Sequence, residues 1–212
     1  MSYGLKIYRE DGSLFISPDV TPLNYIGKFR FEGNATLFTG VPSSANIMSF
    51  IRNDTSTGAA YVIPVQSGGQ WNLSVDTNNS AGYVYVFADV VTVTTGIGLA
   101  VYNAYGKMVW NTDCIPLQIN YIDNPYNGTG SGPNVNYDVD VGVPAAVISG
   151  MSSTYLIALN PAESLYIYGT MVARAYGNIV GAYARDGEQV HGIPPTARFK
   201  KQYLYIDTNF YP

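Results

Sequence analysis

Residues 98–117 read GLAVYNAYGKMVWNTDCIPL, and residues 4–23 read GLKIYREDGSLFISPDVTPL. Aligned without a gap, the two stretches are identical at seven of 20 positions, and the apolar positions between them also agree. Each has two β-rich runs around a turn glycine, Gly12 or Gly106, which supplies the positive φ of a tight hairpin turn. Two unrelated hairpins would share the alternation but not Asp, Pro and Leu at the same distance beyond the turn. The sequence therefore predicts a true internal repeat.

The identical positions have structural duties. We expect the aspartate of each copy to cap the bend after the hairpin by accepting backbone N–H bonds, and the proline to fix φ where the chain leaves it. None of the shared residues is a nucleophile or a base. The repeat positions to which we assign such duties are Gly4, Gly12, Asp19 and Pro22 in the first copy and Gly98, Gly106, Asp113 and Pro116 in the second.

The rest of the chain is a series of short β-rich runs closed by Gly, Asn, Asp, Ser or Thr, and no window supports a helix of three turns. In YVYVFADV (residues 83–90) both alternating faces are apolar, as expected for a strand that is covered on both sides or lies at a subunit interface. The sequence predicts an all-β fold: one or more antiparallel β-sandwiches of many short strands, with a repeated β-hairpin and little or no helix.

The repeat suggests two domains. The first β lobe would span residues 1–95 and open with hairpin 4–23, and the second would span 96–212 and open with hairpin 98–117. The alternative is one continuous β-sandwich over residues 1–212, because the residues that follow each hairpin do not align.

Composition narrows the class of partner. Of 212 residues, 47% are hydrophobic, only 12% are charged, and 19 are tyrosines, which suit interfaces because the ring is apolar and the hydroxyl is polar. The net charge of −4 and the small size of the tightest basic group, Arg198 with Lys200 and Lys201, argue against nucleic-acid binding. No stretch approaches the roughly 20 apolar residues of a membrane span, so we expect no membrane insertion. The N-terminus has no apolar core of the length that a secretory signal needs.

Catalytic chemistry has little support. His191 is the only histidine and has no recognisable nucleophile partner, and the single cysteine, Cys114, takes the place of Val20 in the repeat as a small buried hydrophobe. Asp138 and Asp140 share one face of a strand, where paired carboxylates could serve glycoside hydrolysis or calcium binding, but such pairs are commoner without a role. We expect no catalytic residue, no cofactor and no enzymatic activity.

A polar loop at 123–134, DNPYNGTGSGPN, is bracketed by tyrosines. Its Asp123, Asn124 and Asn127 offer oxygen ligands without EF-hand spacing, so we expect no metal site. Aromatic rings beside amides can bind sugars, and the alternative is that these rings pack against a partner or the core. The residues that we single out for contact with a glycan or a partner are Tyr121, Tyr126, Asn127 and Tyr137.

The opening phrase Tyr3-Gly4-Leu5, the repeated hairpins and the ending YLYIDTNFYP resemble proteins of the tail tip and fibre attachment region of tailed bacteriophages. The resemblance covers about a quarter of the chain and carries no functional residue over, because the shared positions are structural. It implies a virion tail protein made in the host cytoplasm.

Three functions follow for comparison. The first is a structural and interaction subunit of a phage tail, forming a homo-oligomer or docking onto a symmetric assembly of other virion proteins. The alternative is a receptor-binding β-sandwich module that contacts a glycan or protein on the host surface. The least favoured is a glycan-degrading enzyme.

Overall fold

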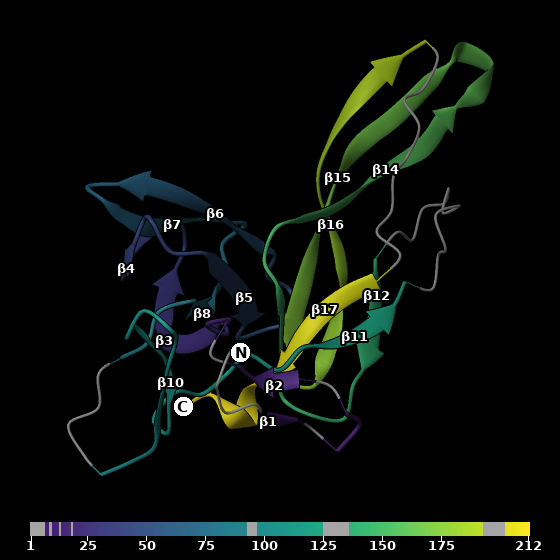
Figure 1. The fold of residues 1–212 in the computed structure, drawn as a ribbon. Helices are drawn as coiled ribbons and strands as arrows, with labels where there is room; N and C mark the ends of the chain where they lie inside the picture. Colours follow the sequence, from purple (N-terminus) through teal and green to yellow (C-terminus); the bar gives the residue numbers. More distant parts are fainter. Residues whose placement is uncertain are drawn as a thin grey trace.

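The computed structural model describes residues 7–8, 10–12, 14–17, 19–92, 97–124, 136–192 and 202–212, and they form an almost entirely β protein (Figure 1). The strands are β1 (Ile7–Tyr8), β2 (Leu14–Ile16), β3 (Asn24–Glu32), β4 (Ala35–Pro42), β5 (Ile47–Asn53), β6 (Ala60–Ser67), β7 (Gln70–Thr77), β8 (Ala81–Ala88), β9 (Ala100–Tyr102), β10 (Met108–Asn111), β11 (Asn120–Asp123), β12 (Tyr137–Asp140), β13 (Ala145–Ile148), β14 (Met151–Asn160), β15 (Leu165–Tyr176), β16 (Ile179–His191) and β17 (Gln202–Asp207).

The helical elements of the described residues are two short 3-10 helices, η1 (Pro161–Glu163) and η2 (Thr208–Phe210). The prediction of an all-β fold with little helix is confirmed. No helix in the described ranges has the length and apolar character needed to cross a membrane.

The strands form three main antiparallel sheets and two hairpins. The central sheet has six strands in the order β11-β17-β13-β5-β8-β3. A four-stranded sheet, β12-β16-β15-β14, and a three-stranded sheet, β4-β7-β6, pack against it, and the largest hydrophobic cluster contains buried residues of all three. The fold is thus a sandwich in which two smaller sheets cover one face of a larger one.

Strand β8 shows how the central sheet is covered on both faces. Val84 and Val86 lie in the cluster between the three sheets, whereas Tyr85 and Phe87 lie in a second cluster on the opposite face. Because side chains alternate along a strand, the two apolar faces seen in the sequence belong to two separate cores. The second core is closed by the C-terminal Tyr211, whose ring meets that of Phe87 edge-on at 4.8 Å.

The proposed boundary at residue 95 does not follow the sheets. Strands β3, β5 and β8 come from the first half and β11, β13 and β17 from the second, and β13 pairs directly with β5 through Val147↔Ile51 and Ile148↔Phe50. The lobes 1–95 and 96–212 therefore share one sheet, which is the arrangement of a continuous sandwich.

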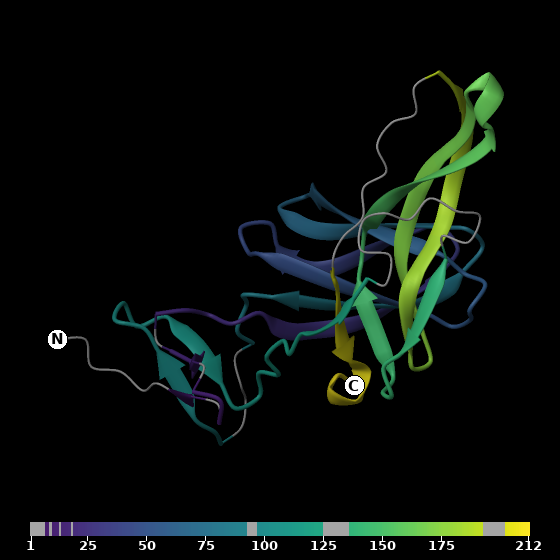
Figure 2. The ribbon, with the colours of Figure 1, turned by 90° about the vertical axis from the view of Figure 1, so that its right-hand side faces the viewer.

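Two parts project from this body. The distal halves of β14, β15 and β16 form a three-stranded arm, and the hairpins β1–β2 and β9–β10 lie together at the other side of the molecule (Figure 2). The pairing from Leu165↔His191 to Gly169↔Gly187 gives the arm a length of about 17 Å at the usual rise of a strand.

Candidate interaction surface

The two copies of the repeat fold into hairpins with the same register. Ile7 lies opposite Ile16, and the equivalent Val101 lies opposite Trp110. Tyr8 pairs with Leu14 as Tyr102 pairs with Met108, and each hairpin has a shift of register in the same place. In both, three residues of the second strand oppose two of the first, which is the count of a β-bulge.

The turns and the bends after them are also equivalent. Gly12 and Gly106 have φ of +79° and +75°. After the hairpin, Ser17 Oγ accepts a bond of 3.1 Å from the backbone N–H of Asp19, and the equivalent Asn111 Oδ1 accepts one of 3.0 Å from the N–H of Asp113. In both bends the aspartate donates its backbone N–H to the side chain two positions before it, and in the first copy the Asp19 carboxylate also accepts from the Ser17 hydroxyl at 3.4 Å.

The segments that leave the two hairpins pair with each other. The N–H of Leu117 donates to the carbonyl of Leu23 (2.7 Å), and Asn24 forms an isolated bridge with Pro116. Leu23 and Leu117 are equivalent positions of the repeat, and they lie opposite each other in this short antiparallel pairing. Pro116 fits this pairing because the bonds of the bridge are made by the residues on either side of it.

The hairpins also pack together through apolar side chains. Val101 and Val109 of the second hairpin are buried, and Ile7 of the first hairpin and Trp110 pack against them. Leu23 and Leu117 join the second core of the body. The paired hairpins, residues 7–23 and 97–117 as far as they are described, are called the hairpin module below.

The outer surface of the hairpin module is unusually apolar for an exposed surface. Tyr8 and Tyr102, equivalent in the repeat, are 57% and 52% exposed. Tyr105, next to the turn glycine of the second hairpin, is 93% exposed. Six of the 13 large apolar side chains exposed in the described residues belong to this small part of the protein: Tyr8, Val20, Ile97, Leu99, Tyr102 and Tyr105. Such a concentration is typical of an interaction surface.

The arm offers a second, smaller apolar surface. At its end Leu159 is exposed, and the side chains of Leu165–Tyr168 are only partly buried. A three-stranded ribbon that stands away from the body buries little apolar surface within the chain, so its apolar side chains are available for a contact.

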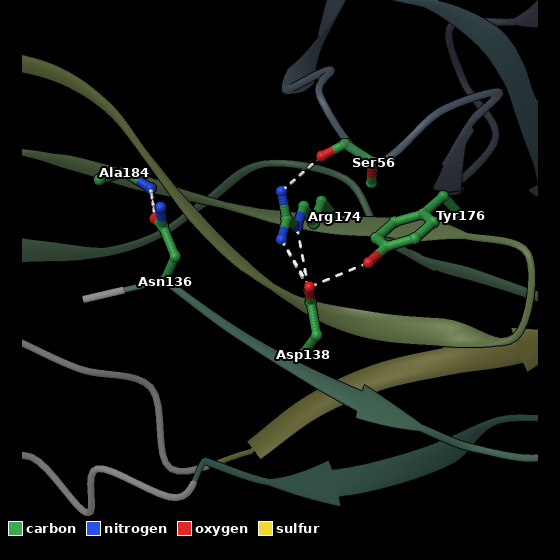
Figure 3. A network of polar contacts seen from close by, with 6 residues as sticks. All are labelled: Ser56, Asn136, Asp138, Arg174, Tyr176 and Ala184. Atoms are coloured by element: carbon green, nitrogen blue, oxygen red, sulfur yellow. Dashed lines mark hydrogen bonds and ion pairs between the residues drawn. The ribbon is translucent and has the colours of Figure 1, made fainter. Parts of the chain in front are cut away.

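Asp138 lies in an ion pair (Figure 3). The guanidinium of Arg174 donates to both of its oxygens, with Nη2 at 2.8 Å from Oδ1 and 2.7 Å from Oδ2, and the Tyr176 hydroxyl donates to Oδ2 at 2.9 Å. Arg174 Nη1 donates to the carbonyl of Ser56 at 2.7 Å. Asp138 is thus bound as a carboxylate in a contact that ties β12 and β15 to the first half of the chain.

The neighbouring groups have structural contacts too. Asn136 Oδ1 accepts from the N–H of Ala184, which holds the start of β12 against β16 (Figure 3). Asp140 Oδ1 accepts from the N–H of Gly142. His191 is exposed at the end of β16, where it lies opposite Leu165 in the arm. Within the described residues, no three His, Cys, Asp or Glu side chains come together as metal ligands.

The four residues chosen for glycan or partner contact do not form one surface in the described part of the chain. Tyr121 is 62% exposed on β11, the edge strand of the central sheet. Tyr137 is buried, and its ring meets that of Tyr203 edge-on at 5.7 Å, so it belongs to the core rather than to a binding surface. Tyr126 and Asn127 lie outside the described residues.

Two structural roles were missed from the sequence. Ser17 and Asn111 differ between the copies, so identity did not mark them, although both can accept a local backbone bond. Arg174 carried a clearer signal, because an arginine within the apolar run of residues 165–177 must have a partner when the strand is buried.

The chain matches no protein-family model, and no curated protein or solved structure is significantly similar to it. Its function must therefore be inferred from its own surfaces.

Proposed function

We propose that this protein is a structural and interaction subunit of a larger assembly, and that the hairpin module is its main contact surface. The observation that carries the proposal is the cluster of exposed apolar side chains on the module, with Tyr8 and Tyr102 at equivalent positions. Most of the charged side chains in the described part of the sandwich form hydrogen bonds or ion pairs with other groups of the chain. We take this as support for assembly over catalysis.

The assembly is a bacteriophage tail, in the tip or fibre attachment region. This part of the proposal rests on the resemblance of the two hairpins and of the C-terminal segment to proteins of that region. An antibody against this protein is expected to label the tail tip of intact particles in electron micrographs, and labelling of the capsid alone would contradict it.

The partner is a second copy of the chain. The module presents an exposed tyrosine at the equivalent position of each copy, Tyr8 and Tyr102, and the same surface of a second chain would meet it in a symmetric contact. The arm, at the other side of the molecule, would supply a further contact in the same assembly.

Light scattering after size exclusion tests this directly. The unaltered protein is expected to form an oligomer whose population rises with concentration. The double variant Tyr8→Asp/Tyr102→Asp should be a monomer, because it replaces the exposed tyrosine of both copies and leaves neither one intact for the apolar contact. Tyr121→Asp is the matched control, since Tyr121 is equally exposed but lies on β11.

The folding of all three proteins is compared by circular dichroism and thermal unfolding. If the double variant keeps its melting temperature but loses its oligomer, the contact is assigned to the module. A protein that is monomeric at every concentration, or a folded double variant that still associates, would contradict the proposal.

A further inference from the structure

Three cations gather on one face of the central sheet, although the chain is acidic overall. Lys28 lies opposite Tyr85, and Arg30 lies opposite Tyr83, which in turn lies opposite Arg52. Because cross-strand neighbours point to the same side of a sheet, the cations and both tyrosine rings share one surface of β3, β8 and β5.

Among the described residues, carboxylates neutralise one of the three cations. Arg30 Nη1 lies 2.7 Å from Asp54 Oδ2, and its Nη2 lies 3.4 Å from Glu32. Lys28 and Arg52 form no ion pair with any described residue. Arg52 is held instead by a neutral contact, in which its Nη1 donates to Thr208 Oγ1 at 3.0 Å. Two positive charges are therefore left available to a ligand.

The rings complete a recess beside these charges. A cavity of about 290 Å³ is lined by Lys28, Arg52, Asn53, Asp54, Tyr83 and Tyr85. Lys28 Nζ lies 5.3 Å from the centre of the Tyr83 ring, and the Arg30 guanidinium 5.0 Å from it, so the ring helps to hold the cations in place. The recess is close to the smallest volume of a small-molecule site, which suits a single ring.

The floor of the cavity is polar but neutral. Tyr85 is 4% exposed and lies beside Arg52 in the lining. Its phenol is neutral at physiological pH like that of any tyrosine, and burial raises its pKa further. The cavity therefore combines two cations, a neutral hydroxyl and one carboxylate, Asp54.

We propose that this cavity binds a carboxylate-bearing sugar unit of the hexuronate type. Lys28 and Arg52 would receive the carboxylate of the sugar. Asp54 lines the cavity and uses Oδ2 for Arg30, so we assign its second oxygen, Oδ1, to a sugar hydroxyl. A sugar acid carries a carboxylate for the two cations and, several atoms away, hydroxyl groups that can donate to Asp54, so one molecule can satisfy both kinds of charge in the lining.

This inference gives the receptor-binding alternative a site and a ligand class, and it does not depend on the assembly proposal. The assembly-deficient variant Tyr8→Asp/Tyr102→Asp leaves the cavity untouched and should bind the sugar as the unaltered protein does. Loss of assembly and loss of sugar binding are thus measured independently.

Isothermal titration with methyl β-glucuronide provides the test, with methyl β-glucoside as the uncharged analogue. We expect a dissociation constant on the order of 1 mM for the glucuronide, and affinity at least about tenfold weaker for the glucoside, which lacks the charge-assisted bonds. Added salt should weaken glucuronide binding because the cations are close to solvent.

Substitutions locate the site. Lys28→Ala is expected to weaken binding about tenfold without loss of fold, because Lys28 is exposed and makes no ion pair. Arg52→Ala should do the same, and its unfolding is measured in parallel because it also loses the bond to Thr208. Lys107→Ala, which removes an exposed cation of the hairpin module, is the control and should bind normally.

Several results would overturn the proposal. These are absence of binding at 20-fold higher sugar concentration than the expected constant, on the order of 20 mM, equal binding of glucuronide and glucoside, and an unchanged affinity in Lys28→Ala. Equal binding of inorganic phosphate or of an acidic peptide would likewise show a general anion surface rather than a sugar site.

Discussion

Arg174 illustrates how single charged side chains are used in this sandwich. It is buried on β15, and it donates to Asp138 and to the carbonyl of Ser56. A buried guanidinium is costly without a counter-ion, so we expect Asp138 to stabilise the fold by pairing with Arg174. The ion pair with Arg174 gives a structural role to the Asp138 carboxylate, which the sequence analysis considered for glycoside hydrolysis or calcium binding.

Asp138→Ala is expected to lower the free energy of unfolding by about 3 kcal/mol, because it leaves the charge of Arg174 buried and unpaired. Urea unfolding followed by tyrosine fluorescence measures the change. Asp140→Ala is the control and should cost less than about 1 kcal/mol, since Asp140 accepts a single local bond. Equal losses in the two variants would contradict the assignment.

Tyr25 gives a prediction in the alkaline range. Its hydroxyl donates to the carbonyl of Pro212, and burial, with a smaller effect of Tyr85, raises its pKa to about 12. The folded state thus favours the protonated phenol. The resulting stabilisation is complete below pH 10, the ordinary pKa of tyrosine, and is lost as the pH rises toward about 12.

Absorbance at 295 nm, recorded against pH for the unaltered protein and for Tyr25→Phe, isolates this group. The difference between the two curves should show one tyrosine that ionises about two pH units later than usual. A difference curve centred near pH 10 would be inconsistent with the burial of the hydroxyl.

Close packing between β8 and β5 leaves no room for a side chain at Gly82 of β8. A Cβ on Gly82 would lie 2.1 Å from the carbonyl oxygen of Arg52 and 2.9 Å from Phe31 Cζ. Since the first of these atoms is backbone, the sheet must distort to accept a methyl group. Gly12, in contrast, has open space around it and a positive φ of +79°, so a substitution there meets strain but no clash.

Gly82→Ala should therefore lower the free energy of unfolding by about 3 kcal/mol, and Gly12→Ala by about 1 kcal/mol. Chemical denaturation of the two variants side by side provides the measurement. A Gly82→Ala protein that is as stable as Gly12→Ala would show that β8 and β5 are packed less closely than described.

Strands and turns could be predicted where they depend only on residues close together in the sequence. Turn glycines and alternation are encoded in neighbouring residues, so the strands and the two equivalent hairpins follow from the sequence. Burial of Tyr137 could not be predicted, because it depends on Tyr203, which is far away in the sequence and meets it across the core between two different sheets. The cationic cavity was missed for the same reason: Lys28, Arg52 and Tyr83 meet only when β3, β8 and β5 pair.

At the scale of the whole molecule, the central sheet joins the two halves of the chain. Its middle pair is β5 with β13, one from each half, and the main core contains residues of both. The two halves that the repeat suggests thus contribute strands to one sheet, and the hairpin module projects from it.

Separate expression of residues 1–95 and 96–212 tests this organisation. Each fragment alone is expected to be unfolded, because each would expose one side of the β5–β13 pair and half of the core, whereas the two fragments mixed should regain β structure. Dispersed amide signals in the NMR spectrum of either fragment alone would contradict a shared sheet.

The doubling of the hairpin has a genetic consequence. If the same adhesive surface occurs twice in one polypeptide, a mutation in one copy leaves the other intact, and a screen of single substitutions would score both Tyr8 and Tyr102 as dispensable. The two copies are then free to drift apart, as the replacement of Val20 by Cys114 at equivalent positions illustrates. Redundancy of this kind hides a surface from mutational scans until both copies are altered together.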